Sequence, residues 1–111
     1  MNAFVHTLQE LSSHPGTIGI IGAGAMGSGI AQVAAAAGHE VVLVDAHTEA
    51  LDRSAAALSK VMSRQVEKGR MTSEASAALQ GRIHRTTEVA ACAPCGLVIE
   101  AIVERLDGYY P

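Results

Sequence analysis

One stretch of the chain, residues 17–45, restricts the fold more than any other. It begins with an apolar run of strand length, Thr17–Ile21, and continues as a glycine turn with the sequence GAGAMG. The alanine-rich segment Ser28–Ala37 predicts a helix, and the apolar run Val41–Val44 predicts a second strand, which ends at Asp45. A strand, a glycine turn, a helix, a second strand and an acid follow one another in the order of a dinucleotide-binding βαβ unit.

The glycines of the turn have distinct physical roles in such a unit. The first permits the tight turn, the second lets backbone approach a pyrophosphate, and the third lets the helix pack closely on the strand. The helix N-terminus presents free N–H groups and the positive end of its dipole to phosphates. A buried βαβ unit whose glycines serve packing alone explains neither a glycine at the tip of the turn nor the acid. The predicted pyrophosphate-binding residues are Gly22, Gly24, Ala25, Met26 and Gly27.

Asp45 predicts which dinucleotide binds. It follows Gly27 by 18 residues, close to the interval of about 20 residues expected for the ribose-binding acid. A carboxylate at this position can accept hydrogen bonds from both ribose hydroxyls of the adenosine half and would repel a 2′-phosphate. The sequence therefore predicts NAD, rather than NADP, as the cofactor.

The remaining segments predict an α/β fold of the Rossmann type, with a doubly wound parallel sheet in the strand order 3-2-1-4. A helix pair is inserted between strands 2 and 3; its first helix ends near Lys68 and Gly69, and its second begins at Thr72 or Ser73. The continuous apolar run of the fourth strand predicts burial on both faces. The third and fourth strands are expected at Arg82–Thr86 and Leu97–Ala101, with a short helix at Glu88–Ala93 between them.

Composition limits the other classes of function. The chain has 111 residues and a net charge of −3, with no basic patch for nucleic acid. It contains no apolar run of the roughly 18 residues that a membrane span needs, and its start lacks the pattern of a signal peptide. We expect an N-terminal extension at residues 1–16, a dinucleotide-binding domain at 17–106, an atypical tail at 107–111, and a cytoplasmic location.

Cys92 and Cys95 form a CxxC motif. One such pair supplies only two of the four ligands of a structural zinc site, and no histidine pair stands at zinc-finger spacing. In redox proteins the motif opens a helix, whereas here it leads into a strand. The sequence therefore predicts two reduced structural thiols and no metal site.

Three segments, IGAGAMGSGIAQVAAAAGHEVVLVD, VEKGRMT and LVIEAIVE, closely resemble the N-terminal domain of 3-hydroxyacyl-CoA dehydrogenases, in particular the 3-hydroxybutyryl-CoA type. The resemblance covers Thr17–Leu106. It implies that the parent protein oxidises (S)-3-hydroxyacyl-CoA to 3-ketoacyl-CoA in fatty acid metabolism, passing a hydride to NAD. It also implies that Ala101 and Ile102 lie along the cofactor, Glu104 near the nicotinamide, and Lys68 near the phosphates of CoA.

The chain departs from the family pattern in its tail. Where the family continues with a lysine-bearing helix, this sequence reads Asp107-Gly108-Tyr109. The catalytic histidine, its glutamate partner and the C-terminal catalytic and dimerisation domain of the family have no counterpart among these residues. We therefore expect a truncated cofactor-binding portion without catalytic residues, inactive alone, that self-associates through its exposed sheet edge. The alternative is a stand-alone dinucleotide-binding or interaction module that has no catalytic function.

Overall fold

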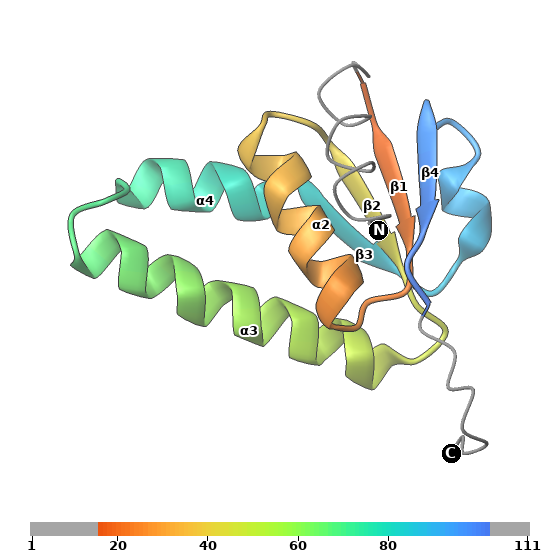
Figure 1. Ribbon diagram of the computed structural model, residues 1–111, viewed down its shortest axis with the longest axis horizontal. Coiled ribbons are helices and arrows are strands. Elements are labelled where there is room, and N and C mark those ends of the chain that lie inside the picture. Colours follow the sequence, from red (N-terminus) through yellow and green to blue (C-terminus); the bar gives the residue numbers. More distant parts are fainter. Residues whose placement is uncertain (1–15, 103–111) are drawn as a thin grey trace, which may run out of the picture.

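The computed structural model describes residues 16–102 and contains a parallel sheet of four strands in the order β3-β2-β1-β4 (Figure 1). The predicted α/β fold and strand order are therefore confirmed. The predicted extension, apart from Gly16, and the predicted tail lie outside the described residues. The strands are β1 (Ile18–Ile21), β2 (Val41–Val44), β3 (Ile83–Thr86) and β4 (Leu97–Glu100).

The register of the sheet brings the carboxyl ends of its strands to one edge. Ile18 of β1 is level with Val41 of β2 and Leu97 of β4, and all pairs are parallel. Gly22, Asp45 and Ala101, which directly follow β1, β2 and β4, are therefore neighbours at that edge. In an open α/β sheet this is the edge at which ligands bind.

Helix α2 (Ala25–Ala36) begins three residues before the predicted start at Ser28. The reason is that Gly24 takes an extended conformation as the N-cap residue, so the second half of the glycine turn already forms the first helical turn. Past the other end of the helix, Gly38 has a φ of +98°, a left-handed conformation that costs glycine no steric strain. The predicted glycine stop is therefore confirmed.

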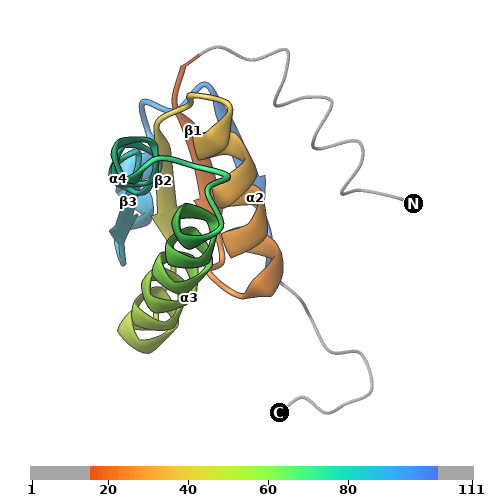
Figure 2. The same ribbon diagram turned by 90° about the vertical axis from the view of Figure 1, so that its left-hand side faces the viewer.

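Helices α3 (Thr48–Glu67) and α4 (Ser73–Gly81) form a hairpin that projects beyond the sheet (Figures 1 and 2). Gly69, with a φ of +72°, ends the first helix. Thr72 is the N-cap of the second, since its Oγ1 accepts a hydrogen bond of 3.0 Å from the Ala75 amide. This settles the choice between Thr72 and Ser73 that the sequence left open.

One core fills the space between the sheet and these three helices. Ile18 and Ile20 of β1 are 0% exposed and pack with Leu43 of β2. The small side chains of α2 let that helix lie close to the strands, where burial of apolar surface stabilises the fold. The helical members of the core are Ile30, Ala31, Ala34, Ala35, Leu51, Leu58, Met62 and Leu79.

Among the described residues, the 3₁₀ helix η1 (Val89–Cys92) covers the opposite face of the sheet, in the segment where the sequence predicted a short helix. It packs against β1 and β2. The expectation that β4 is buried on both faces is wrong, since Val98 is 46% exposed and Glu100 is also exposed. Among the described residues β4 is an edge strand, and its alternate side chains point to the face that the three larger helices leave uncovered.

The helix-to-strand contact at Gly27 gives a direct test of this packing. A Cβ added to Gly27 would collide with the carbonyl oxygen of Gly22, whereas one added to Gly29 on the same helix meets nothing within 4 Å. We predict that Gly27→Ala lowers the free energy of unfolding by about 3 kcal/mol. Gly29→Ala should leave it unchanged or raise it by up to about 1 kcal/mol. Urea unfolding followed by circular dichroism measures both, and equal effects would contradict this account.

Candidate functional site

A cavity of about 560 Å³ lies at the carboxyl edge of the sheet. Its volume falls within the range of small-molecule sites. The glycine turn, the end of β2, the segment after β3 and the segment after β4 all contribute to its wall. The lining residues are Ile21, Gly22, Gly24, Ala25, Met26, Val44, Asp45, Ala46, His47, Thr87, Val89, Ala101 and Ile102.

Gly22 fixes the start of the turn. Its φ is +111°, a conformation that residues with a side chain rarely adopt. Its amide donates a hydrogen bond of 2.7 Å to the carbonyl oxygen of Val44. A Cβ at this position would stand 2.9 Å from the carbonyl oxygen of Ala101. The turn is therefore clamped between the ends of β2 and β4, and only glycine fits there.

Gly24 provides open space beside the N-terminus of α2. A Cβ added to it would meet nothing within 4 Å, and the residue is exposed at the cavity. No side chain of the described residues caps this helix. The first-turn N–H groups of α2 therefore remain available to an anionic ligand, and the positive end of the helix dipole favours one. The turn thus fits a pyrophosphate.

Asp45 is held in place by the backbone at the mouth of the cavity. Its Oδ2 accepts a hydrogen bond of 2.8 Å from the Ala23 amide, and its Oδ1 accepts one of 2.9 Å from the His47 amide. The imidazole Nδ1 of His47 lies 3.2 Å from Oδ1. A carboxylate has about four acceptor positions, so capacity remains for a ribose hydroxyl.

The pKa of Asp45 reflects two opposed effects. Burial of the side chain acts to raise the pKa, but hydrogen bonds from the Ala23 and His47 amides, together with the His47 imidazole, outweigh it. The pKa of Asp45 is therefore lower than its usual value, and the carboxylate is ionised near neutral pH.

Apolar side chains form much of the remaining wall. Met26, Val89 and Ile102 are 40%, 58% and 59% exposed, and all three line this one cavity. Such a wall suits the flat rings of a dinucleotide. Thr87 and Val89 were not predicted from the sequence, although they lie just after the carboxyl end of β3, where ligands bind in such sheets. Ile21, Val44 and Ala46 were not predicted at the site either.

The similarity of the chain to known proteins agrees with a dinucleotide site at this cavity. The profile of the family described as "3-hydroxyacyl-CoA dehydrogenase, NAD binding domain" matches residues 17–108. The chain belongs to this family. The cofactor of the family domain is NAD, in agreement with the prediction from Asp45.

Relatives and solved structures agree with this assignment. A "Probable 3-hydroxybutyryl-CoA dehydrogenase" of Deinococcus radiodurans is 50% identical over 86 residues, which are 78% of this chain and 31% of that protein. The 3-hydroxyadipyl-CoA dehydrogenase of Escherichia coli is 41% identical over 91 residues, 82% of this chain and 19% of that protein. A crystal structure of 3-hydroxybutyryl-CoA dehydrogenase from Escherichia coli matches with a TM-score of 0.79 and 39% identity, over 85% of this chain and 20% of that one. The chain thus spans about a third or less of the length of these relatives.

Lys68, which the resemblance linked to the phosphates of CoA, does not line the cavity. Lys68 is the exposed C-cap of α3. It belongs to the turn between α3 and α4, at the end of the hairpin farthest from β4 (Figure 1). Glu104 lies outside the described residues. Of the remaining predicted cofactor residues, only Gly27 does not line the cavity, since its role is to let α2 pack against Gly22.

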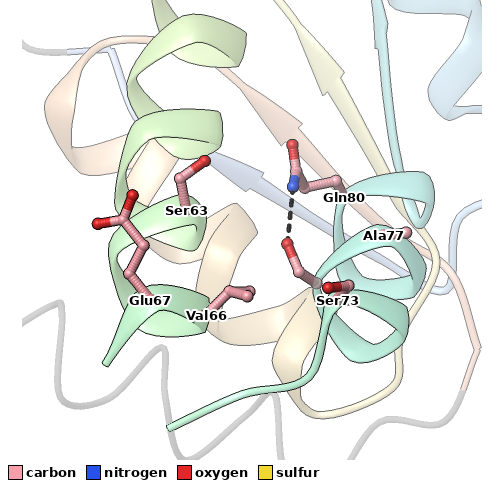
Figure 3. Close-up of a pocket in the computed structure, with 7 residues that line it drawn as sticks. Ser63, Val66, Glu67, Ser73, Ala77 and Gln80 are labelled. Carbon is pink, nitrogen blue, oxygen red and sulfur yellow. Dashed lines mark hydrogen bonds between the residues drawn. The ribbon is translucent and has the colours of Figure 1, made fainter. Parts of the chain in front are cut away.

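A second groove, of about 370 Å³, lies between α3 and α4 (Figure 3). None of its lining residues belongs to the glycine turn. Inside it the Gln80 side-chain amide donates a hydrogen bond of 3.0 Å to Ser76 Oγ. None of its lining residues is a glycine, so it offers no glycine turn of the kind that fits a pyrophosphate. Its lining residues are Ser63, Val66, Glu67, Ser73, Ser76, Ala77 and Gln80.

The described histidines are distributed over both edges of the sheet. His39 Nδ1 lies 2.9 Å from the carbonyl oxygen of Gly16, and His84 Nε2 lies 2.8 Å from Glu40 Oε1. Both contacts lie toward the amino edge, away from the cavity, whereas His47 lines the cavity beside Asp45. Within residues 16–102 no group of three or more histidine, cysteine, aspartate or glutamate side chains could hold a metal ion. No helix in this range is long and apolar enough to cross a membrane.

The lowered pKa of Asp45 predicts a pH-dependent contribution to stability. Because the folded pKa lies below the usual 3.8, the contribution is present above that value and is lost as the pH falls through the folded pKa. We predict that Asp45→Asn unfolds at lower urea concentration than the native chain at pH 7, and that the difference shrinks between about pH 4 and pH 2. A difference that stays constant over this range would contradict the prediction.

Proposed function

We propose that this chain is the NAD-binding portion of an oxidoreductase that oxidises (S)-3-hydroxyacyl-CoA to 3-ketoacyl-CoA, with residues 17–106 as the dinucleotide-binding domain. One observation carries the proposal: a glycine turn, a helix N-terminus without a side-chain cap and an ionised Asp45 lie around one cavity. The printed names of its relatives, which include 3-hydroxybutyryl-CoA and 3-hydroxyadipyl-CoA dehydrogenases, support the substrate class.

The residues of the cavity have separate roles in this proposal. The turn from Gly22 to Gly27 holds the pyrophosphate through backbone N–H groups, and Asp45 binds the adenosine ribose. Ala101 and Ile102, at the end of the fourth strand, lie along the cofactor, and Glu104 approaches the nicotinamide side. NAD, when bound, accepts the hydride that leaves the substrate carbon. The protein supplies orientation and a site partly shielded from water.

Oxidation of an alcohol also requires a base that takes the hydroxyl proton as the hydride leaves. Among the described residues, His47 is the only histidine that lines the cavity, and it is bonded to Asp45, the residue assigned to the adenosine ribose. In this proposal His47 therefore lies at the adenosine end of the cofactor, whereas the base must act at the nicotinamide end. We infer that turnover depends on a base outside residues 16–102.

The acyl-CoA side of the proposal involves Lys68. It is exposed at the turn between α3 and α4, with Arg70 exposed two residues later, so two cations are available to CoA phosphates there. The groove between these two helices begins beside this turn, with Glu67 in its wall. The competing function is a stand-alone nucleotide-binding module, which would not need to bind CoA at this position.

Binding of CoA distinguishes these two functions. The dehydrogenase proposal predicts that Lys68→Glu weakens CoA binding about tenfold, because a charge-assisted hydrogen bond to a phosphate is lost. Arg53→Glu, an equal change of charge on the exposed surface of α3, is the matched control and should have little effect. Titration calorimetry with CoA measures both. Equal CoA affinities of Lys68→Glu and Arg53→Glu would favour the stand-alone nucleotide-binding module.

Cofactor choice tests the assignment of Asp45. We predict that NAD binds more tightly than NADP and that Asp45→Ala weakens NAD binding at least about tenfold, since hydrogen bonds to a charged group are lost. Asp52→Ala, which removes an exposed acid from α3, serves as the control. Tighter binding of NADP, or an unchanged affinity in Asp45→Ala, would refute the assignment. Addition of 3-hydroxybutyryl-CoA to the chain with NAD should produce no NADH absorbance.

Self-association is a further part of the proposal, and it is supported by the position of β4 at the edge of the sheet within residues 16–102. Val98 is 46% exposed on an edge strand, and an exposed apolar edge is open to pairing with another chain. We predict oligomers by light scattering at high concentration, and predominantly monomer for Val98→Lys. Val33→Lys, at a similarly exposed valine on α2, should not change the oligomer. A monodisperse monomer of the native chain would contradict this.

A further inference from the structure

Two cysteines converge on one position of the central strand, on the face of the sheet opposite the large helices. Cys92, the last residue of η1, is buried, Cys95 is half-buried, and both are free thiols. A Cβ built on Gly19 of β1 would lie 2.9 Å from Cys92 Sγ and 3.1 Å from Cys95 Sγ. The two sulfur atoms therefore occupy the space that a side chain at residue 19 would fill.

The backbone between the cysteines suits a bridge. The Cys95 amide donates a hydrogen bond of 2.9 Å to the Cys92 carbonyl oxygen, which closes a tight turn. In such a turn the first and last Cα atoms are less than about 7 Å apart, and a disulfide requires about 4.4–6.8 Å. Side chains at positions i and i+3 of a 3₁₀-type turn also project in the same direction. Closure thus needs little movement of the chain.

Gly19 of β1 provides the space in which the two sulfur atoms meet. Glycine inside a strand weakens it and often marks a close approach of other atoms. Here the atoms that approach are the two sulfurs. A zinc site is a poor alternative, because the described residues contain no group of three or more possible ligands and two thiolates fill only half of a zinc coordination shell.

We propose that Cys92 and Cys95 form a reversible dithiol–disulfide site that exchanges with a small disulfide of the glutathione class. The Cys95 thiolate, which is the more accessible, attacks the small disulfide, forms a mixed disulfide and releases one glutathione thiolate. The Cys92 thiolate then attacks the Cys95 sulfur and releases the second. The two cysteine protons pass to the two glutathione thiolates, so two cysteine thiols are oxidised and one glutathione disulfide is reduced.

The surroundings of the pair determine its resting state. Burial, with a smaller contribution from the Cys92 thiol, raises the pKa of Cys95. The Cys95 thiol is therefore protonated near neutral pH, and its attack is slow, since only the thiolate attacks. Val89, at the other end of η1, lines the cofactor cavity. The site is thus one short turn away from the wall of the cofactor cavity.

The test uses the full 111-residue chain, equilibrated in glutathione buffers with different ratios of thiol to disulfide. After acid quenching and alkylation with a maleimide, intact mass spectrometry counts the free thiols. We expect one reversible transition from a doubly alkylated chain to an unalkylated chain that has lost two hydrogen atoms, with little mixed disulfide. Cys92→Ser should accumulate one glutathione adduct at Cys95, whereas Cys95→Ser should remain unmodified because Cys92 is buried.

Other results would overturn the proposal. These are a native chain that stays doubly alkylated at every ratio, one that carries two glutathione groups, and one that forms disulfide-linked dimers. An adduct on Cys95→Ser but none on Cys92→Ser would reverse the assigned order of attack. Circular dichroism of both serine variants checks that they fold. The titration of the native chain decides the existence of the site without them.

Discussion

A hydrogen bond of 2.8 Å from the Ala23 amide to Asp45 Oδ2 links the turn after β1 to the residue that follows β2. With the hydrogen bond from the Gly22 amide to the Val44 carbonyl oxygen beside it, it fixes the glycine turn relative to the Asp45 carboxylate before any ligand binds. A site held ready in this way loses less conformational entropy on binding. The same amide hydrogen bonds that orient the Asp45 carboxylate also outweigh the effect of burial and lower its pKa, so it is ionised near neutral pH.

The parts of the fold that could be predicted from sequence are those fixed by local steric rules. Gly38 and Gly69 adopt positive φ angles at the ends of α2 and α3 because few other residues do so without strain. The first βαβ unit and Asp45 followed from the spacing of residue types alone. The strand order 3-2-1-4 followed from that unit, since a dinucleotide-binding crevice implies a sheet whose order reverses beside β1.

The remaining features depend on contacts between distant segments. The true start of α2 depends on how Gly24 caps the helix, which apolar periodicity does not reveal. The exposure of Val98 depends on what covers one face of β4, and Val89 reaches the cavity through the path of the chain after β3. The convergence of Cys92 and Cys95 over Gly19 is likewise tertiary. The sequence shows the CxxC motif of Cys92 and Cys95 but does not show that Gly19 lies against it.

The central claim is that the cofactor binds at the glycine turn and Asp45 rather than in the groove between α3 and α4. An NMR titration of the ¹⁵N-labelled chain with NAD tests it most directly. The account predicts that the largest amide shifts occur at Gly22, Gly24 and Met26, with further shifts at Asp45 and Ile102, while residues 63–80 change little. Shifts concentrated in residues 63–80, or none at millimolar NAD, would contradict it.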